Sequence, residues 1–282
     1  MEVDTPLPSP YEIYQSNPEI YEQVNDKDAR IVLNGKRHYH NPFGTKPTPS
    51  VTTIISETAS EANKKKLEMW SKNNPGVKEA AAERGTAIHS CMEMYLKKEE
   101  VNVPPEYSDF WTGMEPMLDQ FEEVIWAETP LYDHHQYCLS SDEVGRVWGR
   151  NNEGFSWVGS PDIIGVANGK LTLADLKTSA KPYCRWWPKD LEKGSLEWRN
   201  RLGGYMKFNK CCLQLGAYAL GIEQTLNMKV QQAAILVSTP EGTQLFKITR
   251  NHLNSAQDKW LKVVNEYYTS PEREEVYDPG LI

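Results

Sequence analysis

The sequence has no long apolar run. None of its stretches approaches the roughly 20 apolar residues that a membrane-spanning helix needs, so we expect no membrane partner. Its first residues, Met1-Glu2-Val3-Asp4, are acidic and lead into a proline-rich stretch, unlike a signal peptide or a basic transit peptide. These absences argue against the membrane and secretory classes and predict a cytoplasmic protein.

Cysteine is also scarce. The cysteines are odd in number, and no two of them form a C-x-x-C pair. This argues against a disulfide framework and a zinc ribbon, and we expect reduced, structural thiols. The G-x-x-x-x-G-K-[ST] loop of nucleotide-driven motors is absent too. The five cysteines are Cys91, Cys138, Cys184, Cys211 and Cys212.

Basic charge is in the minority, since 31 lysines and arginines stand against 39 acidic residues and the formal net charge is −8. Taken alone, this argues against binding nucleic acid, because neutralising phosphates needs lysine and arginine. Residues 177–210, called the basic segment below, differ: they hold nine basic and three acidic residues. The segment could be a surface for phosphates or only a solvated loop. Its basic residues are Lys177, Lys181, Arg185, Lys189, Lys193, Arg199, Arg201, Lys207 and Lys210.

Hydrophobic periodicity and turn residues predict an α/β fold, with a helical N-terminal part and a central mixed sheet flanked by helices. We expect an N-terminal arm and hairpin over 1–48, a main domain over 49–270 and a tail over 271–282. Helices are predicted from Ser50 or Thr52 onward and over 61–73, 79–98, 108–126, 213–226 and 251–268, the last capped by Asn251. Strands are predicted over 31–39 (a hairpin), 125–132, 137–139, 155–158, 163–166, 171–177, 233–237 and 244–248.

The dipeptide Asn168-Gly169 between two apolar runs predicts a two-residue type I′ hairpin. Paired residues in such a hairpin have numbers with the same sum as the turn residues, which here is 337, and Asp162 and Asp175 share that sum. We therefore expect the two aspartates to lie opposite each other, with Cβ atoms about 4.5–5.5 Å apart. Pro161 predicts that the ladder bends there.

Two carboxylates facing each other across a strand pair repel, so they usually hold a cation or share a proton. Oxygen ligands favour Mg²⁺ or Mn²⁺ over zinc. Lys177 lies two residues beyond Asp175 and so projects from the same face. A metal, two carboxylates and a lysine could together attack a phosphodiester. The alternative is an exposed hairpin with solvated side chains.

Four motifs in order resemble those of one enzyme superfamily. The segments Gly159-Ser160-Pro161-Asp162 and Asp175-Leu176-Lys177-Thr178 are similar to the signature of PD-(D/E)xK nucleases. The segments Arg84-Gly85-Thr86-Ala87-Ile88-His89 and Gln214-Leu215-Gly216-Ala217-Tyr218 resemble motifs of its RecB-like branch. Pro49-Ser50-Val51-Thr52 fits a subgroup similar to the mitochondrial genome maintenance exonuclease and to phage exonucleases. The resemblance covers about 49–268.

This resemblance implies roles for individual residues. The metal ligands would be His89, Asp162, Asp175 and the backbone carbonyl of Leu176, and Lys177 would position the attacking water. Glu93, one helical turn after His89, could bind a second metal or support the first, or be a solvated glutamate. Gln214 and Tyr218 would line the site beside the DNA strand, or merely form an amphipathic face. Glu128 lies on the predicted strand before the motif, where relatives often carry an acidic residue.

DNA contacts are expected from the N-terminal helices and from the basic segment. Trp186 lies among lysines and arginines, where an indole suits stacking on unpaired bases, although it could instead pack on the core. Gly85, inside a predicted helix, would be explained by close approach of DNA or of another backbone. The expected DNA-binding residues are Arg84, Ser50, Thr52, Lys181, Arg185, Trp186, Arg199 and Arg201.

The sequence therefore predicts a Mg²⁺- or Mn²⁺-dependent DNA exonuclease acting from free ends of single-stranded DNA, in replication, recombination or degradation. The alternatives are a structure-selective endonuclease of the same fold and a non-catalytic DNA-binding module. The subgroup makes a phage origin plausible, which would place the protein in the host cytoplasm. No iron–sulfur cluster is expected, because the C-terminal cysteine group of some relatives is missing.

Overall fold

The computed structural model describes residues 30–41, 46–127, 129–130 and 146–271. The expected arm over 1–29, the strand over 137–139, Glu128 and nearly all of the tail lie outside the described residues. In the described part, no helix is both long and apolar enough to span a membrane.

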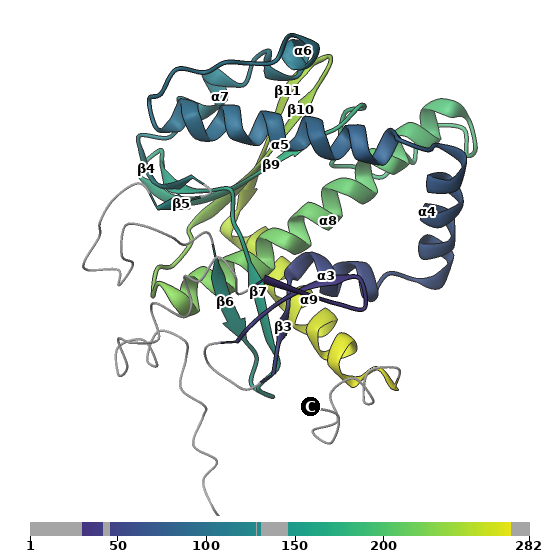
Figure 1. The fold of residues 1–282 in the computed structure, drawn as a ribbon, viewed down its shortest axis with the longest axis vertical. Helices are drawn as coiled ribbons and strands as arrows, with labels where there is room; N and C mark the ends of the chain where they lie inside the picture. Colours follow the sequence, from purple (N-terminus) through teal and green to yellow (C-terminus); the bar gives the residue numbers. More distant parts are fainter. Residues whose placement is uncertain (1–29, 42–45, 128, 131–145, 272–282) are drawn as a thin grey trace, which may run out of the picture.

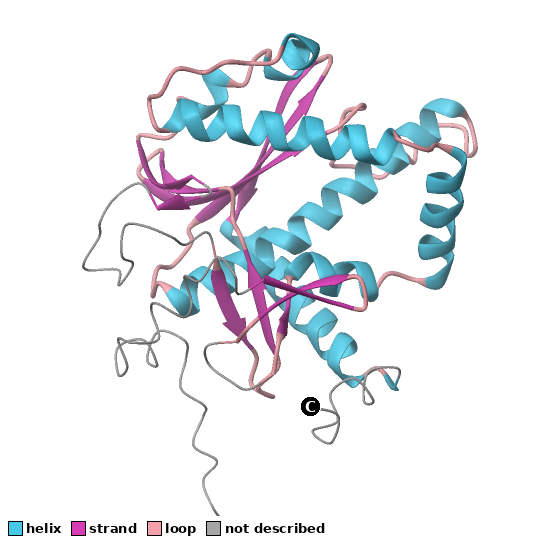
Figure 2. Ribbon diagram, in the orientation of Figure 1, coloured by secondary structure: helices cyan, strands magenta, loops and turns pink. Residues whose placement is uncertain are grey.

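The centre of the molecule is a six-stranded mixed sheet (Figures 1 and 2). Strands β9 and β10 pair in parallel and the other neighbours are antiparallel. The predicted mixed sheet flanked by helices is thus confirmed. The strand order is β11 (Gly242–Thr249), β10 (Gln232–Thr239), β9 (Lys170–Thr178), β8 (Ile163–Ala167), β4 (Glu123–Ala127) and β5 (Thr129–Pro130).

Successive residues of β9 and β10 face opposite sides of this sheet, and each side has its own core. On one side, Leu173 packs in a cluster with residues of α8 (Leu196–Thr225) and α9 (Arg250–Thr269). On the other, Leu176 packs with residues of α5 (Val77–Leu96). Three short helices complete this second cover: η2 (Pro105–Tyr107), α6 (Ser108–Trp111) and α7 (Glu115–Leu118). Asp175 and Lys177 share the alternation of Leu173 and so face α8.

The β8–β9 hairpin has the predicted register. Its pairs run from Ala167↔Lys170 to Ile163↔Ala174. Asn168 and Gly169 have φ values of 52° and 64°, the left-handed conformation that a type I′ turn requires. The turn sequence therefore determined the pairing of the two strands.

Smaller sheets join the N-terminal part to the core. Strands β1 (Arg30–Leu33) and β2 (Lys36–Tyr39) form the hairpin predicted at Asn34-Gly35, and β3 (Thr48–Pro49) pairs with β2 across the expected domain boundary. Ser50 caps α3 (Val51–Glu57), accepting a hydrogen bond from the backbone N–H of Thr53. Ser50 also bridges to Val158 of β7 (Ser156–Gly159), which pairs with β6 (Val147–Arg150).

Several predicted elements were wrong in extent. No single helix covers 108–126; Gly113, at φ 77°, ends α6, Pro116 lies in the first turn of α7, and β4 follows. Helix α8 begins at Leu196, well before the predicted residue 213. Thr249, and not Asn251, caps α9, accepting from the backbone N–H of His252. Strand β6 was missed.

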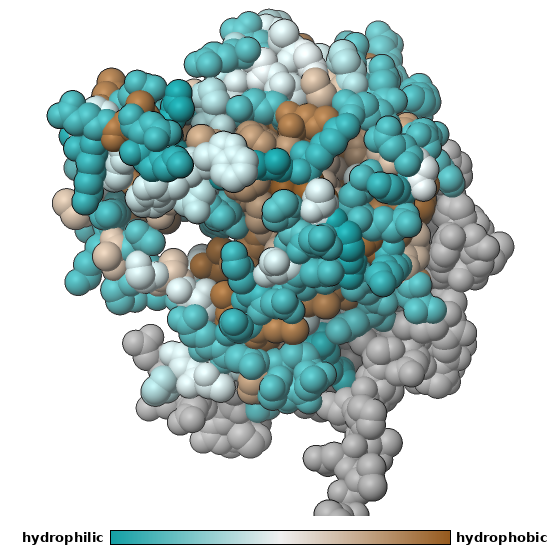
Figure 3. Space-filling view, turned by 180° about the vertical axis from the view of Figure 1, so that it is seen from behind, coloured by the Kyte–Doolittle hydropathy of each residue, from teal (hydrophilic) through white to brown (hydrophobic). Residues whose placement is uncertain are grey.

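Helix α4 (Glu61–Asn73) has the predicted bounds but an unusual position. None of its residues is buried, and Leu67 and Trp70 are 66% and 45% exposed. The helix connects α3 to α5 at one side of the molecule (Figure 1). In the space-filling view of Figure 3, an opening separates this arm from the body. The N-terminal helices therefore form an arm around an opening.

Candidate active site

Asp162, Asp175 and Lys177 meet at the end of the β8–β9 hairpin. Asp175 is completely buried, and its Oδ1 has no hydrogen-bond partner. The ammonium nitrogen of Lys177 lies 2.5 Å from its Oδ2 as an ion pair. Asp162 precedes β8, in the bend after Pro161, and its Oδ2 accepts from the backbone N–H of Leu176 at 2.6 Å. The last pair of the β8–β9 ladder at this end is Ile163↔Ala174. Asp162 and Asp175 lie one position beyond it, so the ladder stops one pair earlier than predicted.

His89 approaches the same carboxylates from α5. Its Nδ1 lies 3.8 Å from Oδ1 of Asp162. His89 and Glu93 line a hollow of about 520 Å³ along this face of α5. Glu93 forms an ion pair with Lys97, N–O distance 2.6 Å. Gly85 lines the hollow as well, and a Cβ there would meet only Thr178 Oγ1 at 3.7 Å, so close backbone packing does not explain this glycine.

Helix α8 supplies the opposite wall. Gln214 Nε2 donates to the Tyr218 hydroxyl at 2.6 Å, and both side chains are buried. A Cβ on Gly159 would lie 2.3 Å from the Tyr218 ring, so the glycine of the Gly159–Asp162 motif makes room for this tyrosine. Lys207 and Cys211 precede Gln214 by seven and three residues and thus share its helix face.

Burial dominates the electrostatics of the cluster. It raises the pKa of Asp175 to about 6, partly offset by Lys177 and reinforced by Asp162. Burial disfavours the charged Lys177, but Asp175 and Asp162 together hold its pKa well above the ordinary value. The pKa of Tyr218 is raised, first by burial and then by Asp175. At neutral pH the centre thus holds an ionised lysine beside a carboxylate whose ionised form is disfavoured by burial.

The donor types at the centre fit a hard divalent cation, namely two carboxylates, an imidazole and the Leu176 carbonyl. The unpartnered Oδ1 of buried Asp175 favours such an ion, because a buried carboxylate oxygen needs a donor or a cation. Within the described ranges, however, no three His, Cys, Asp or Glu side chains are arranged together as a ligand set. The Asp175 carboxylate pairs with the Lys177 ammonium, and Asp162 accepts from the Leu176 N–H.

The raised pKa of Asp175 predicts how stability depends on pH. Because the folded-state value of about 6 lies above the ordinary 3.8, the folded protein binds more protons than the unfolded chain between these values. This group therefore stabilises the fold as pH falls. Relative to metal-free Asp175→Asn, we expect metal-free wild type to gain Tm as the pH falls from 7 towards 4. Thermal melts of both proteins across this range test this, and a difference independent of pH would contradict it.

The expected DNA-binding residues are only partly brought together. Arg84 lies over the ring of Phe110, 4.5 Å from its centroid, and its Nε is buried without a partner. Arg185 donates to the Lys247 carbonyl on β11 and lies over the ring of Phe208. Trp186 is 74% exposed, so packing on the core is excluded for it.

The remaining basic residues lie on exposed surface at the start of α8 and just before it. Lys181 bonds to Asn200, and Arg199 donates to the Gly194 carbonyl. Arg201 pairs with Glu197 at 3.3 Å. The basic segment is therefore no single loop, since its second part is helical.

Sequence reasoning missed three residues beside the centre. Arg37 and Tyr39, from the N-terminal hairpin, line a pocket that also contains Asp162 and Lys177. Lys207 donates to the hydroxyl of buried Ser179 at 3.0 Å. Burial lowers the pKa of Lys207, and the charges of Arg84 and Lys181 lower it further, so three cations gather past the end of β9. The helical spacing of Lys207 from Gln214 could have pointed to it.

Comparison with known proteins adds little to this geometry. No protein-family profile matches the chain, and no curated protein matches it significantly. Among solved structures, SSO0001 has 12% identity and a TM-score of 0.31, with 81% of each chain covered. A protein named "Putative exonuclease" from Eubacterium rectale has 16% identity and a TM-score of 0.30, over 68% of this chain and 74% of that one. Neither value establishes a shared activity.

Proposed function

We propose that this chain is a metal-dependent exonuclease that hydrolyses phosphodiester bonds of single-stranded DNA from a free end, on a PD-(D/E)xK core. One observation carries the proposal: the fully buried Asp175, with Lys177 2.5 Å away and Asp162 beside it, at the end of a strand hairpin. A buried charge cluster that lines an open pocket is typical of a catalytic centre. The motifs of the RecB-like branch supply the same residues.

His89, Asp162, Asp175 and the Leu176 carbonyl would hold the ion. When bound, a divalent ion would lower the pKa of a water and neutralise charge on the phosphate. The ionised Lys177 would then orient the attacking water and stabilise the charge that develops on the phosphate oxygens. Gln214 and Tyr218, hydrogen-bonded to each other, would position the strand and keep the centre partly dry.

Two hollows flank the centre and suggest the path of the strand. The pocket beside Arg37 contains Asp162 and Lys177, and the hollow on α5 contains His89 and Glu93. Nδ1 of His89, in the hollow, lies 3.8 Å from Oδ1 of Asp162, in the pocket, so the two cavities meet there. A single strand that crosses from one hollow to the other would present a phosphate to the centre.

The arm of α4 favours an exonuclease over an endonuclease. An opening bounded by a continuous chain admits a strand most easily by threading from an end. Lys64, Lys65 and Lys66 on α4 are basic residues suited to backbone phosphates. A non-catalytic DNA-binding module would have no need for a buried carboxylate paired with a lysine.

The test compares linear and circular single-stranded DNA of the same sequence in Mg²⁺. We expect the linear strand to be degraded progressively and the circle to persist. Linear DNA with streptavidin on both ends should also resist, because a blocked end cannot thread. Rapid cutting of the circle would indicate the endonuclease alternative, and no cutting of any DNA would overturn the proposal.

Phosphate binding by the basic segment predicts a salt effect. Neutralising Lys181, Arg185, Arg199 or Arg201 to glutamine should weaken DNA binding, and removing one cation that touches a phosphate should lower the salt slope by about one unit. Fluorescence anisotropy at several salt concentrations measures both quantities, with Lys262→Gln, at an exposed position of α9, as the matched control. Unchanged affinity and slope for all four variants would leave these residues as solvated surface only.

A further inference from the structure

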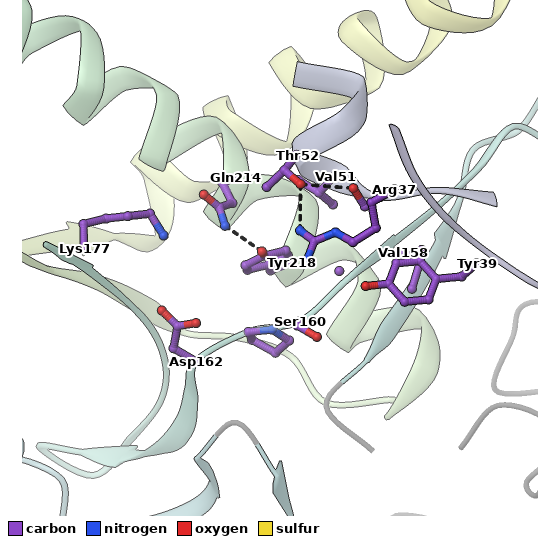
Figure 4. Close-up of a pocket in the computed structure, with 13 residues that line it drawn as sticks. Arg37, Tyr39, Val51, Thr52, Val158, Ser160, Asp162, Lys177, Gln214 and Tyr218 are labelled. Atoms are coloured by element: carbon purple, nitrogen blue, oxygen red, sulfur yellow. Dashed lines mark hydrogen bonds between the residues drawn. The ribbon is translucent and has the colours of Figure 1, made fainter. Parts of the chain in front are cut away.

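The pocket beside the catalytic cluster extends well beyond it. Its volume is about 330 Å³, and Asp162 and Lys177 form one end. Arg37, Tyr39 and Thr52 lie at the other end, on the N-terminal hairpin and α3 (Figure 4). These residues are far from the catalytic motifs in the sequence and are unnecessary for holding a metal. The pocket therefore has room for something attached to the reacting phosphate.

Hydrogen bonds fix the side chain of Arg37 and leave several of its N–H donors for an anion. One of its Nη atoms donates to Thr52 Oγ1 at 2.9 Å, and Thr52 in turn bonds to the Ser50 hydroxyl at 3.0 Å. Among the described residues, no carboxylate lies within ion-pair distance of its guanidinium. A guanidinium has five N–H donors, so most of them remain for a ligand. Planar donors of this kind match phosphate oxygens.

The rest of the lining suits a sugar and a base. Val51, Val158 and Pro161 form an apolar wall, and Ser160 adds a further hydroxyl. The hydroxyl of Tyr39 points towards the pocket, while Arg146 lies over the ring, 4.7 Å from its centroid (Figure 4). Apolar walls with a few convergent polar groups are typical of small-ligand sites, whose volumes begin near about 300 Å³. The pocket is thus of a size for one nucleotide and not for a duplex.

We infer that this pocket is a subsite for one nucleotide unit next to the cleaved bond, with Arg37 binding its phosphate and the wall of Val51, Val158 and Pro161 contacting its sugar or base. The inference rests on the proposed function for what is cleaved. The shared chemistry is a deoxynucleotide phosphate, either within the strand or as a free mononucleotide product.

Binding without cleavage tests the subsite separately from the nuclease activity. Thymidine, its 3′-monophosphate and its 5′-monophosphate are titrated into the protein with Ca²⁺ by calorimetry. At least one monophosphate should bind wild type about tenfold or more tightly than thymidine, since an Arg–phosphate contact is charge-assisted. Arg37→Gln should lose that advantage, Arg37→Lys should retain part of it, and Arg30→Gln, an exposed arginine of the same hairpin, should keep it in full.

A second arm separates the strand from a free nucleotide. A single uncharged methylphosphonate linkage is moved along an oligonucleotide, and affinity is measured with Ca²⁺. Wild type should lose affinity about tenfold at one linkage, and Arg37→Gln should be insensitive at that linkage.

Equal binding of thymidine and both monophosphates, or unchanged monophosphate binding by Arg37→Gln, would overturn the subsite. Monophosphate binding without any sensitive linkage would overturn its assignment to the strand. If DNA is never cleaved but these binding results hold, the proposed function fails while the nucleotide site stands.

Discussion

Asp175→Ala is expected to abolish DNA cleavage while leaving the protein folded and able to bind DNA. The carboxylate is fully buried and pairs with the Lys177 ammonium at 2.5 Å, so its removal leaves that ammonium without its partner and should lower the Tm. Its proposed task is to hold a divalent ion, and metal affinity should therefore fall. DNA affinity should persist or rise, because a negative charge near phosphate is removed.

Calorimetric titration with Mg²⁺ and single-turnover cleavage measure these two effects. Asp190→Ala, which removes an exposed aspartate of the basic segment, is the matched control and should behave as wild type. Cleavage by Asp175→Ala near the wild-type rate would place the active centre elsewhere. Loss of DNA binding together with cleavage would point to unfolding, which a thermal melt would reveal.

Lys177→Ala is expected to stop cleavage for a different reason. A preorganised cation that stabilises the transition state contributes at least ~10²-fold to the rate. Metal affinity should be unchanged or higher, since lysine is no ligand for Mg²⁺ and its ammonium lies 2.5 Å from the Asp175 carboxylate, where it competes with the ion. The two variants thus lose the same activity and differ in metal binding.

The same titration and single-turnover assays apply, with Lys170→Ala at the exposed start of β9 as control. Ca²⁺ should support DNA binding without cutting in wild type and in Lys177→Ala, because it tolerates a looser geometry than Mg²⁺. A fall in metal affinity for Lys177→Ala as large as that for Asp175→Ala would contradict the separate roles.

Local sequence determined the elements whose geometry depends on neighbouring residues. Asn168-Gly169 can adopt positive φ values, and this alone set the register that brings Asp162 towards Asp175. Ser50 could be predicted as a helix cap because its hydroxyl serves an N–H only three residues away. The face shared by Gln214 and Tyr218 follows from the helical period.

Tertiary packing decided the rest. The start of α8 is polar and carries no strong periodic signal, but Gly204 packs against the backbone of Pro182 and Cys184, which orders this part of the helix. Arg37 joins the pocket only because β2 pairs with β3 and Ser50 bridges to β7, contacts between segments far apart in the chain. No spacing in the sequence encodes such contacts, since they depend on how whole elements pack. The motifs of the proposed active site were therefore readable from residues alone, whereas the pocket beside them exists only in the folded protein.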